Sequence, residues 1–429
     1  MSPSSQRRPW PLPIGLLRVQ AVELLLGGSL LLCLAFLFYP GLIASRVPAF
    51  RDAYHFYYPQ AVWLDACVQR GEYFPVWNAA EGWGVSVAGQ PSAALYYPGR
   101  LLWLLPGLST AQRFSFAIVA HLLLAALGIR YAAARIGLSR HAAWLAAFSY
   151  SLSCPILFQH NNFIYLCSAA WIGFAIAGLV GFLQHRSVEQ WCRSGFLFSA
   201  ACCLMLLGGD PHTLANTLLV AGGTLLWYVA GWPRGLGHRS GAMWGRAGGA
   251  AAWFACGGLL IATLTAVQWL PALRWASHSA RLGSATAQLP ELPAPLDTAW
   301  QDAPSSTHRL YDFSLSPWHL VTGLWPTLGG HYLPHNSRLF TAIPAEGRMW
   351  IPSLYFGLLP CLLLWLAFRR PLCNTRPLRL LALFALLASL GNYSLLWLLR
   401  ELLRVLGGQD LSTALPKDHI TSLYWLLTE

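Results

Sequence analysis

An acidic residue closely follows the first long apolar run of the sequence. Asp52 lies within residues 51–59, beside Tyr54 and His55. A carboxylate at the boundary between membrane and water is partly desolvated, so its pKa can move toward that of a general base. The neighbouring aromatic rings can line a pocket for a sugar ring or a lipid head group. A solvated loop with tyrosines at the membrane interface explains the same residues, and composition alone leaves both interpretations open.

A second acid lies in a short turn between two later apolar runs. Residues 208–212 read Gly-Gly-Asp-Pro-His, and such glycine and Asp-Pro pairs are typical of turns. Asp210 and His212 can face the same outer cavity as Asp52, where they would hold a metal ion, hold a phosphate or supply the base. Alternatively, Asp210 caps the helix that starts near Pro211.

Further polar residues stand at the ends of apolar runs that we expect on the same side of the membrane. His160 lies in the polar stretch 159–162, and Arg274 and Arg281 follow the seventh apolar run. A guanidinium group can bind phosphate through two parallel hydrogen bonds. Arg274 and Arg281 are therefore candidate ligands of a lipid-phosphate leaving group. Snorkelling of either arginine to phospholipid head groups explains its position equally well.

The composition shows what kind of chain must position these residues. Hydrophobic residues make up 56% of the 429 residues and charged residues only 10%, whereas a soluble domain carries about 25% charged residues. These values exclude a soluble protein and a disordered chain. The net charge is +12, but the arginines are scattered between apolar runs. This pattern argues against a nucleic-acid partner and indicates orientation in a lipid bilayer.

Nine apolar runs are candidates for transmembrane helices. The short loops on one side of these runs hold fifteen arginines and only two acids, which places that side and the N-terminus in the cytoplasm. We expect the first run to be an uncleaved anchor, because it is longer than a signal core and lacks a clear cleavage site. The runs cover roughly residues 22–44, 112–133, 142–159, 163–183, 194–208, 213–231, 249–270, 351–368 and 379–398.

The sequence therefore predicts an all-α polytopic membrane protein with about nine transmembrane helices and two large external loops. A cytoplasmic tail (1–21) precedes a transmembrane bundle (22–270) that includes the first external loop (45–111). The second external loop (271–350), two further transmembrane helices (351–398) and an external C-terminal segment (399–429) follow. We accordingly expect the polar residues of the functional site on the outer face of the membrane.

Several motifs of soluble enzymes do not occur in the sequence. It has no Walker loop and no GxGxxG, GxSxG or HExxH motif. The apolar runs contain almost no charges near their centres, whereas ion-coupled transporters need acids or broken helices there. This pattern argues against a proton- or sodium-coupled pump, but not against a lipid flippase.

In their order along the chain, the first acid and the motifs after it resemble the YfhO-like family of bacterial membrane proteins. The resemblance covers nearly the whole chain. Each motif is short, so the motifs support the resemblance only as a set. It rests on Asp52, Trp77-Asn78, Gly82-Trp83-Gly84, Tyr96-Tyr97-Pro98, Gly209-Asp210-Pro211-His212, and residues 355–360 and 391–394.

That family is similar to the GT-C group of glycosyltransferases, multi-span enzymes that take a sugar from a polyprenyl-phosphate carrier and act at the outer face of the membrane. The resemblance implies a GT-C-like fold, the bacterial cytoplasmic membrane, a polyprenyl-phosphate sugar donor and a cell-envelope acceptor. It implies that Asp52 is the base or acceptor-orienting residue and that Asp210 and His212 form a second polar site. A histidine stands beside Asp210 in place of a second acid, so the motif does not supply a two-carboxylate metal site, and a divalent metal cofactor stays an open alternative. Family members continue with further spans, so we expect a shortened chain.

Three hypotheses follow. In the first, Asp52 deprotonates or orients an acceptor hydroxyl that attacks the C1 carbon of the donor sugar, and Arg274 or Arg281 stabilises the departing phosphate. The second is a transporter or flippase of lipid-linked sugars, which requires a polar path through the bundle. The third is a non-catalytic scaffold of envelope synthesis, which would tolerate replacement of either acid.

Overall fold

The computed structural model describes residues 14–47, 51–230, 243–277, 314–327, 351–369 and 376–391, together with six isolated positions up to residue 406. In these residues the only strands are β1 (Trp77–Asn78) and β2 (Val85–Ser86), which pair antiparallel. The described part of the chain thus confirms the expected helical character. Its α-helices are α1 (Ile14–Leu37), α2 (Tyr39–Leu42), α3 (Tyr58–Gln69), α4 (Thr110–Ile136), α5 (Arg140–Ser151), α6 (Cys154–Leu157), α7 (Phe163–Leu183), α8 (Val188–Leu207), α9 (Pro211–Val229), α10 (Met243–Leu264), α11 (Ala266–Ala276), α14 (Leu358–Arg369) and α15 (Arg376–Ser389).

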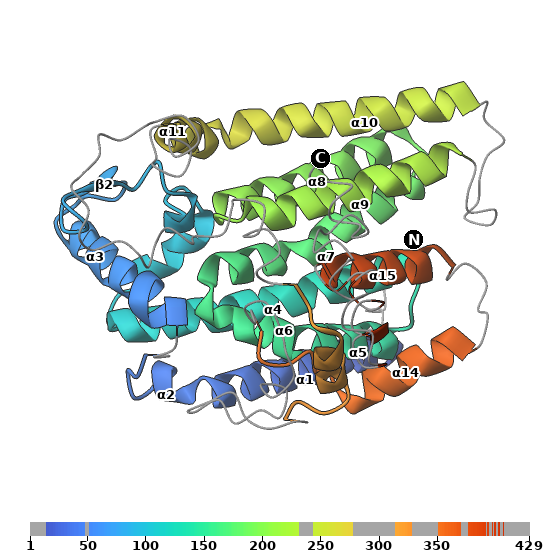
Figure 1. Ribbon diagram of the computed structural model, residues 1–429, viewed down its shortest axis with the longest axis horizontal. Coiled ribbons are helices and arrows are strands. Elements are labelled where there is room, and N and C mark those ends of the chain that lie inside the picture. The colour runs from blue at the N-terminus through green and yellow to red at the C-terminus, as the bar shows by residue number, and fades with distance from the viewer. Residues whose placement is uncertain are drawn as a thin grey trace, which may run out of the picture.

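Four of these helices are long and apolar enough to cross a membrane. They are α4, α7, α8 and the part of α10 over Ala247–Leu264, and the bent pair that starts with α5 makes a fifth if it counts as one span. Figure 1 shows the long helices lying lengthwise, with α10 along the top of the view and α1 along the bottom. Shorter apolar segments lie in α1, α14 and α15. The described residues therefore support a helical membrane protein.

Small residues let the central helices approach closely. A Cβ atom on Gly173 of α7 would lie 2.2 Å from the backbone of Gly128 in α4, and one on Gly178 would lie 2.7 Å from the backbone nitrogen of Phe198 in α8. Lipid tails are as apolar as leucine, so close backbone packing rather than the hydrophobic effect drives helix association in a bilayer. Helix α7 is consequently the central helix, packed between α4 and α8.

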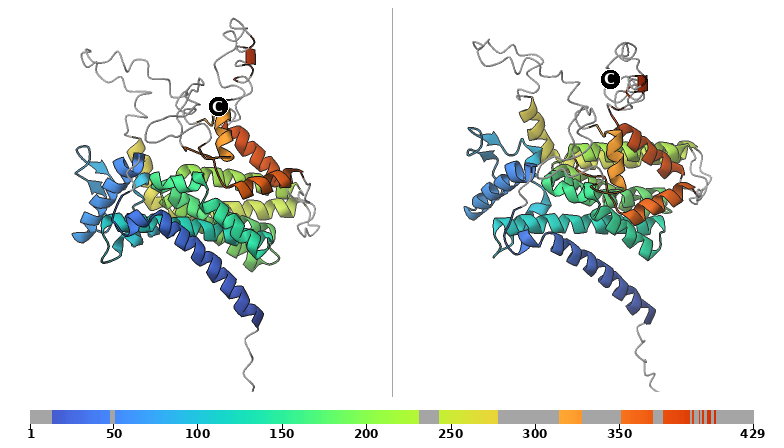
Figure 2. Two further views of the ribbon diagram at one scale, coloured as in Figure 1. Left: turned by 90° about the horizontal axis from the view of Figure 1, so that it is seen from below. Right: turned by 60° about the horizontal axis from the view of Figure 1, so that its bottom comes forward.

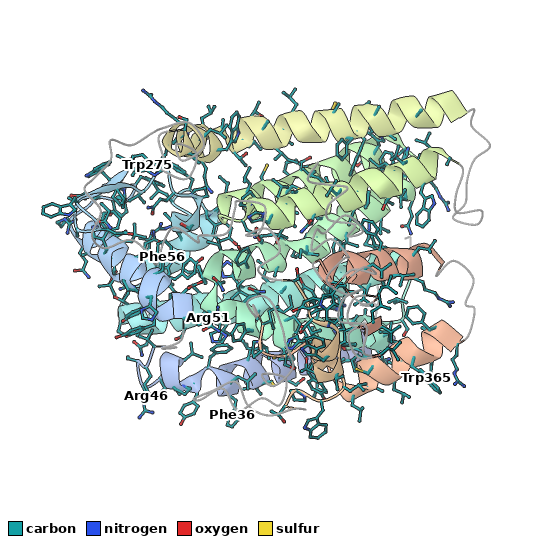
Figure 3. All side chains as sticks on the ribbon, viewed as in Figure 1. Phe36, Arg46, Arg51, Phe56, Trp275 and Trp365 are labelled. Atoms are coloured by element: carbon teal, nitrogen blue, oxygen red, sulfur yellow. The ribbon has the colours of Figure 1, made fainter. Side chains whose placement is uncertain are left out.

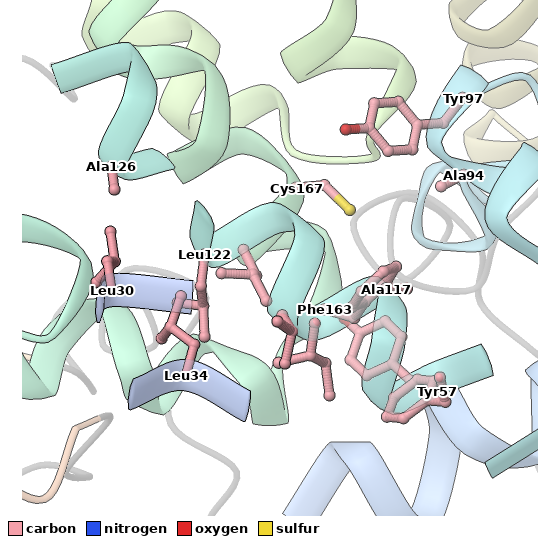
Figure 4. Packing of buried hydrophobic residues seen from close by; sticks show 14 of the residues in the cluster. Leu30, Leu34, Tyr57, Ala94, Tyr97, Ala117, Leu122, Ala126, Phe163 and Cys167 are labelled. Atoms are coloured by element: carbon pink, nitrogen blue, oxygen red, sulfur yellow. The ribbon is translucent and has the colours of Figure 1, made fainter. Parts of the chain in front are cut away.

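Helix α1 is attached to α4 at two points. Leu30 and Leu34 are fully buried in the cluster that contains Leu122 of α4 (Figure 4). Nearer the N-terminus, the Glu23 carboxylate lies 2.5 Å from the guanidinium of Arg130. Figure 2 shows the beginning of α1 leaving the bundle at an angle.

The apolar run expected over residues 142–159 is not one straight span. Helix α5 ends at Ser151, and the helical segment Cys154–Asn161 continues at an angle of 51°. Pro155 explains the break, because proline has no N–H to donate to the carbonyl of Ser151, the last residue of α5. The N–H of Cys154 instead donates to the carbonyl of Tyr355 at 2.7 Å. The break was not expected from the sequence, and a broken helix is one of the two features that ion-coupled transporters use.

The first external loop folds at one end of the bundle. It contains a turn of π-helix, η1 (Ala53–Tyr57), then α3, the hairpin, and the 3-10 segments η2 (Pro91–Ala93) and η3 (Pro98–Leu104). In Figure 1 these elements and α11 lie at the left end. Asp65 of α3 forms an ion pair with Arg113 and accepts a hydrogen bond from Thr110 at 2.6 Å, which ties α3 to the start of α4.

The second loop expected over residues 271–350 begins with helix, because α11 extends to Ala276. Residues 278–313 and 328–350 of that loop lie outside the described residues. A further 3-10 segment, η5 (Pro317–Gly323), follows Leu315, whose N–H donates to the carbonyl of Ser389 in α15 at 2.8 Å. Part of the expected external loop is thus attached to a helix that was expected to be transmembrane.

Tyr97 anchors the first external loop inside the bundle. Its hydroxyl lies 2.8 Å from Nε2 of His121 in α4 and accepts a hydrogen bond from Nε1 of Trp171 in α7 at 2.9 Å. Nδ1 of His121 lies 2.6 Å from the carbonyl of Ala117. A carbonyl only accepts, so Nδ1 carries the proton and Nε2 accepts from Tyr97. The contact fixes the loop against α4 and α7.

Candidate functional site

Asp52 lies at the start of the π-helical turn η1. Arg51 before it has a φ of 48°, a backbone conformation that residues with a side chain rarely adopt. Asp52, Tyr54 and His55 are all exposed, and the rings of Tyr54 and His55 meet edge to face with centroids 5.3 Å apart. The sequence analysis expected a partly desolvated Asp52, whereas the structure gives it an accessible carboxylate. Single turns of π-helix occur frequently at functional sites.

Asp210 is fully buried in the turn between α8 and α9. Its Oδ1 accepts a hydrogen bond from the N–H of Thr213 at 3.0 Å, so Asp210 is the N-cap of α9, and the alternative interpretation is confirmed. The other oxygen, Oδ2, is buried with no hydrogen-bond partner among the described residues. Capping therefore does not exhaust the acceptor capacity of this carboxylate. His212 is exposed and does not share the buried position of Asp210.

The carboxylates of Asp52 and Asp210 both influence the hydroxyl groups of two tyrosines. Both carboxylates interact with Tyr57 of η1 and with Tyr165 of α7. Burial raises the pKa of the Tyr57 hydroxyl well above its ordinary value, and Tyr165, Asp52 and Asp210 raise it further. Tyr57 consequently keeps its proton at neutral pH and can donate a hydrogen bond. Figure 4 shows Tyr57 and Tyr97 of the external loop in the same buried cluster as Phe163 of α7.

His160 is held by its own turn. It belongs to the 3-10 segment η4 (Phe158–Asn161), which packs against η1. Its Nδ1 lies 2.6 Å from the carbonyl of Leu157, and its ring meets that of Phe38 edge to face at 5.7 Å. The neighbouring amide oxygens, Oε1 of Gln159 and Oδ1 of Asn161, are buried with no partner in the described part of the chain. His160 is thus a packed neighbour of the site, and the amides beside it have unused hydrogen-bonding capacity.

The turn that carries Asp210 packs directly on the first external loop. Gly209 has a φ of 97°, and a Cβ atom there would lie 2.4 Å from the carbonyl oxygen of Pro91, so only glycine fits. Gln90 precedes Pro91, and its Oε1 is buried without a partner in the described ranges. Gln268 of α11 donates through Nε2 to the carbonyl of Leu206 at 2.7 Å, and its Oε1 is likewise unpartnered there.

Buried polar atoms without a partner are uncommon in folded proteins. Among the described residues at the end of the bundle where α3 and α11 lie, these atoms are all oxygens, and the choice between oxygen and nitrogen in an amide is an assignment. A group of carboxylate and amide oxygens suits a ligand rich in hydroxyl donors. The sequence analysis missed Gln90 and Gln268, because a single amide next to an apolar run follows no pattern; only the Gly-Gln-Pro turn signal pointed to Gln90. The atoms are Oε1 of Gln90, Gln159 and Gln268, Oδ1 of Asn161, Oδ2 of Asp210 and Oγ of Ser115.

Arg274 is exposed on α11 at the same end of the molecule. The adjacent Trp275 packs on the external loop, because a Cβ atom on Gly89 would lie 2.6 Å from the Cβ of Trp275. Figure 3 shows Trp275 at the end of the bundle where Arg51 and Phe56 lie. Arg281, the second arginine considered as a phosphate ligand, lies outside the described residues. The structure therefore places one of the two arginines near the site.

A metal centre is not evident in the part of the chain that the structure describes. No group of three or more His, Cys, Asp or Glu side chains that could hold a metal ion occurs among those residues.

Comparison of the chain with models of protein families, with curated proteins and with solved structures finds no match. The function must therefore be argued from the site itself.

Proposed function

We propose that this protein is a membrane glycosyltransferase that transfers a sugar from a polyprenyl-phosphate carrier to a cell-envelope acceptor at the outer face of the membrane. The observation that supports this most directly is the convergence of Asp52 and Asp210 on Tyr57 and Tyr165. The site lies where the first external loop meets the bundle, as the resemblance to the YfhO-like family and to GT-C enzymes implies.

The two acids have different roles in the proposed reaction. Asp52 is exposed, so it can receive the proton of an acceptor hydroxyl. The acceptor oxygen then attacks C1 of the donor sugar, the bond from C1 to the phosphate oxygen breaks, and polyprenyl phosphate leaves with the electron pair. Asp210 is fixed by its capping bond, and its Oδ2 accepts a hydrogen bond from a sugar hydroxyl. Arg274 binds the departing phosphate.

The same proposal includes the finer topology. The chain crosses the bacterial cytoplasmic membrane about nine times, with its N-terminus in the cytoplasm. The ion pair between Glu23 and Arg130 belongs to the arginine-rich side of the apolar runs. The folded external loop, the Asp210 turn and α11 then face outward together. A cysteine-accessibility map of the loops from outside intact cells tests this arrangement, and labelling of both sides of one span would contradict it.

A transfer assay in membranes tests the enzymatic function. Label is followed from a panel of polyprenyl-phosphate sugars into envelope polymers, with wild type compared with Asp52→Asn. Loss of the general base is expected to reduce the rate by about 10²–10⁴-fold. Glu72→Gln is the matched control, because Glu72 is an exposed acid of the same loop whose partner is Arg70 at 3.5 Å. Equal transfer by wild type and Asp52→Asn would refute the assignment of the base.

The break between α5 and α6 favours a second candidate function, transport of a lipid-linked sugar across the membrane. Interrupted helices form the binding sites of many transporters because unwound backbone groups become available to a substrate. Here the N–H of Cys154, at the break, donates to the carbonyl of Tyr355 in a distant segment of the chain. Flipping of a fluorescent lipid-linked sugar in proteoliposomes distinguishes the candidates: a transporter flips it and retains this activity in Asp52→Asn.

A further inference from the structure

Trp83 is the most exposed large hydrophobic residue in the described part of the chain, with a relative accessibility of 104%. Its backbone is strained, because Gly82, Trp83 and Gly84 follow one another with φ values of 51°, 70° and 111°. A left-handed conformation is costly for tryptophan, and such strain persists only where the surrounding structure imposes it. The loop thus exposes a large aromatic ring to water, in a backbone conformation that tryptophan disfavours.

The base of this loop is firmly packed. The N–H of Gly84 donates to the carbonyl of Glu81 at 2.7 Å, and a Cβ atom on Gly84 would lie 2.6 Å from the Trp77 ring. That ring meets Trp275 of α11 edge to face, with centroids 6.2 Å apart. Trp83 is therefore presented by a supported turn between β1 and β2.

Polar groups lie beside the exposed ring. Asn78 donates through Nδ2 to Oε2 of Glu81 at 3.2 Å, and its Oδ1 accepts the N–H of Ala80 at 3.0 Å. A sugar ring can place its C–H face on an aromatic ring while its hydroxyls pair with carboxylate and amide groups. Asn78 is buried and holds the carboxylate of Glu81, so the loop offers a ring at Trp83 and an acceptor at Glu81.

The local charge argues against a lipid surface as the ligand. Residues 70–100 contain two acids, Glu72 and Glu81, and two arginines, Arg70 and Arg100, so this segment carries no net charge. Anionic membranes attract basic segments, and this segment gains no such attraction. A neutral glycan carries many hydroxyls and requires no charge of either sign.

We propose that residues 77–84 are a binding platform for a neutral glycan chain, with Trp83 as the stacking residue, and that this glycan is the acceptor of the transfer reaction. The last clause rests on the proposed function, whereas glycan binding does not. Contacts lead from the platform to the acids: Trp77 meets Trp275, Trp275 packs on Gly89, and Pro91 lies on Gly209 beside Asp210.

Fluorine NMR of the full chain labelled with 5-fluorotryptophan in lipid nanodiscs tests the platform. The resonance that is missing in Trp83→Phe is assigned to Trp83. The resonance that is missing in Trp365→Phe is assigned to Trp365, which serves as the control. Trp365 is half exposed on the apolar helix α14, where we expect lipid. Each sample is titrated with chitohexaose and maltohexaose, and separately receives spin-labelled phosphatidylcholine.

The expected result is a saturable shift of the Trp83 resonance with at least one oligosaccharide and broadening of the Trp365 resonance alone by the spin-labelled lipid. Trp83→Ala should weaken oligosaccharide binding, measured by saturation-transfer NMR, roughly tenfold. Absence of a sugar-dependent shift, or lipid broadening of Trp83 comparable with that of Trp365, would overturn the proposal.

The same samples separate this inference from the proposed function. Glu72→Gln should bind oligosaccharide as wild type does, because Glu72 pairs with Arg70 outside residues 77–84. Normal binding together with absence of any transfer by wild type would leave the platform standing and reject the transferase. Normal transfer together with absence of binding would do the reverse.

Discussion

The carboxylates of Asp52 and Asp210 both raise the pKa of one hydroxyl group, that of Tyr57. Asp52 starts the π-helical turn after the first apolar run, whereas Asp210 caps α9 much later in the chain. One acid is exposed and the other is fully buried. An exposed carboxylate can exchange protons with water, and a buried one at a helix start is a fixed acceptor. Because both carboxylates raise the pKa of the same tyrosine, we infer that the two acids work together.

We predict that the two acids contribute non-additively to transfer. Groups that act as a unit give single and double variants of similar activity. Asp52→Asn and the double variant Asp52→Asn/Asp210→Asn should therefore lose transfer to a similar extent. Initial rates of the four members of this cycle provide the measurement, and strictly multiplicative losses would show independent sites.

Replacement of Asp210 should separate its capping role from its functional role. Alanine removes the bond to Thr213 and should cost about 1 kcal/mol of stability, whereas asparagine caps as well as aspartate does. Asp210→Asn should thus unfold like wild type in a thermal melt in detergent but transfer less sugar. An asparagine variant as unstable as the alanine variant would mean that the negative charge itself stabilises the turn.

Gly209 should tolerate no side chain. Its positive φ and its contact with Pro91 imply that Gly209→Ala strains the turn, at a cost of about 1–3 kcal/mol. Gly223 in α9 is the control, because a Cβ atom there meets nothing within 4 Å, and alanine in a helix is more stable than glycine by roughly 0.5–1 kcal/mol. Melts of both variants are the test, and equal behaviour would contradict the packing of the turn on the external loop.

The hydroxyl of Tyr97 should be important for stability. Tyr97→Phe leaves Nε2 of His121 and the Nε1–H of Trp171 buried without a partner, which costs about 1–3 kcal/mol for each such group. Tyr131→Phe serves as control because Tyr131 is 38% exposed. Hydrogen exchange of residues 85–104 should increase in the Tyr97 variant alone, and unchanged exchange would mean that other contacts hold the loop.

Tyr57 should make the protein more sensitive to alkali. Its folded-state pKa lies above the ordinary value of 10, so the unfolded chain loses the phenolic proton first. The stability that the neutral hydroxyl contributes is complete below pH 10 and declines as the pH rises above it. Tyr57→Phe should show a shallower decline when thermal midpoints are compared on either side of about pH 10. A decline of equal slope would show that Tyr57 ionises normally in the folded protein.

The sequence alone predicted the helical membrane class and the position of several helices. A 20-residue apolar helix satisfies its own backbone in a bilayer, so length and composition suffice to find it. The Asp210 cap was also readable, because Asp-Pro at a helix start is a local signal. Helices α4, α7 and α8 accordingly contain or overlap the expected runs.

The tertiary structure alone decided what lies between the helices. Several features depend on contacts between distant segments. They are the bond from the broken span to Tyr355, the insertion of Tyr97 beside His121, and the burial of Oε1 of Gln90 and Gln268. Such contacts leave no period in the sequence, because each requires only one suitable residue on either side. For the same reason, the sequence could select Asp52 and Asp210 as candidates, but only the fold places both around Tyr57.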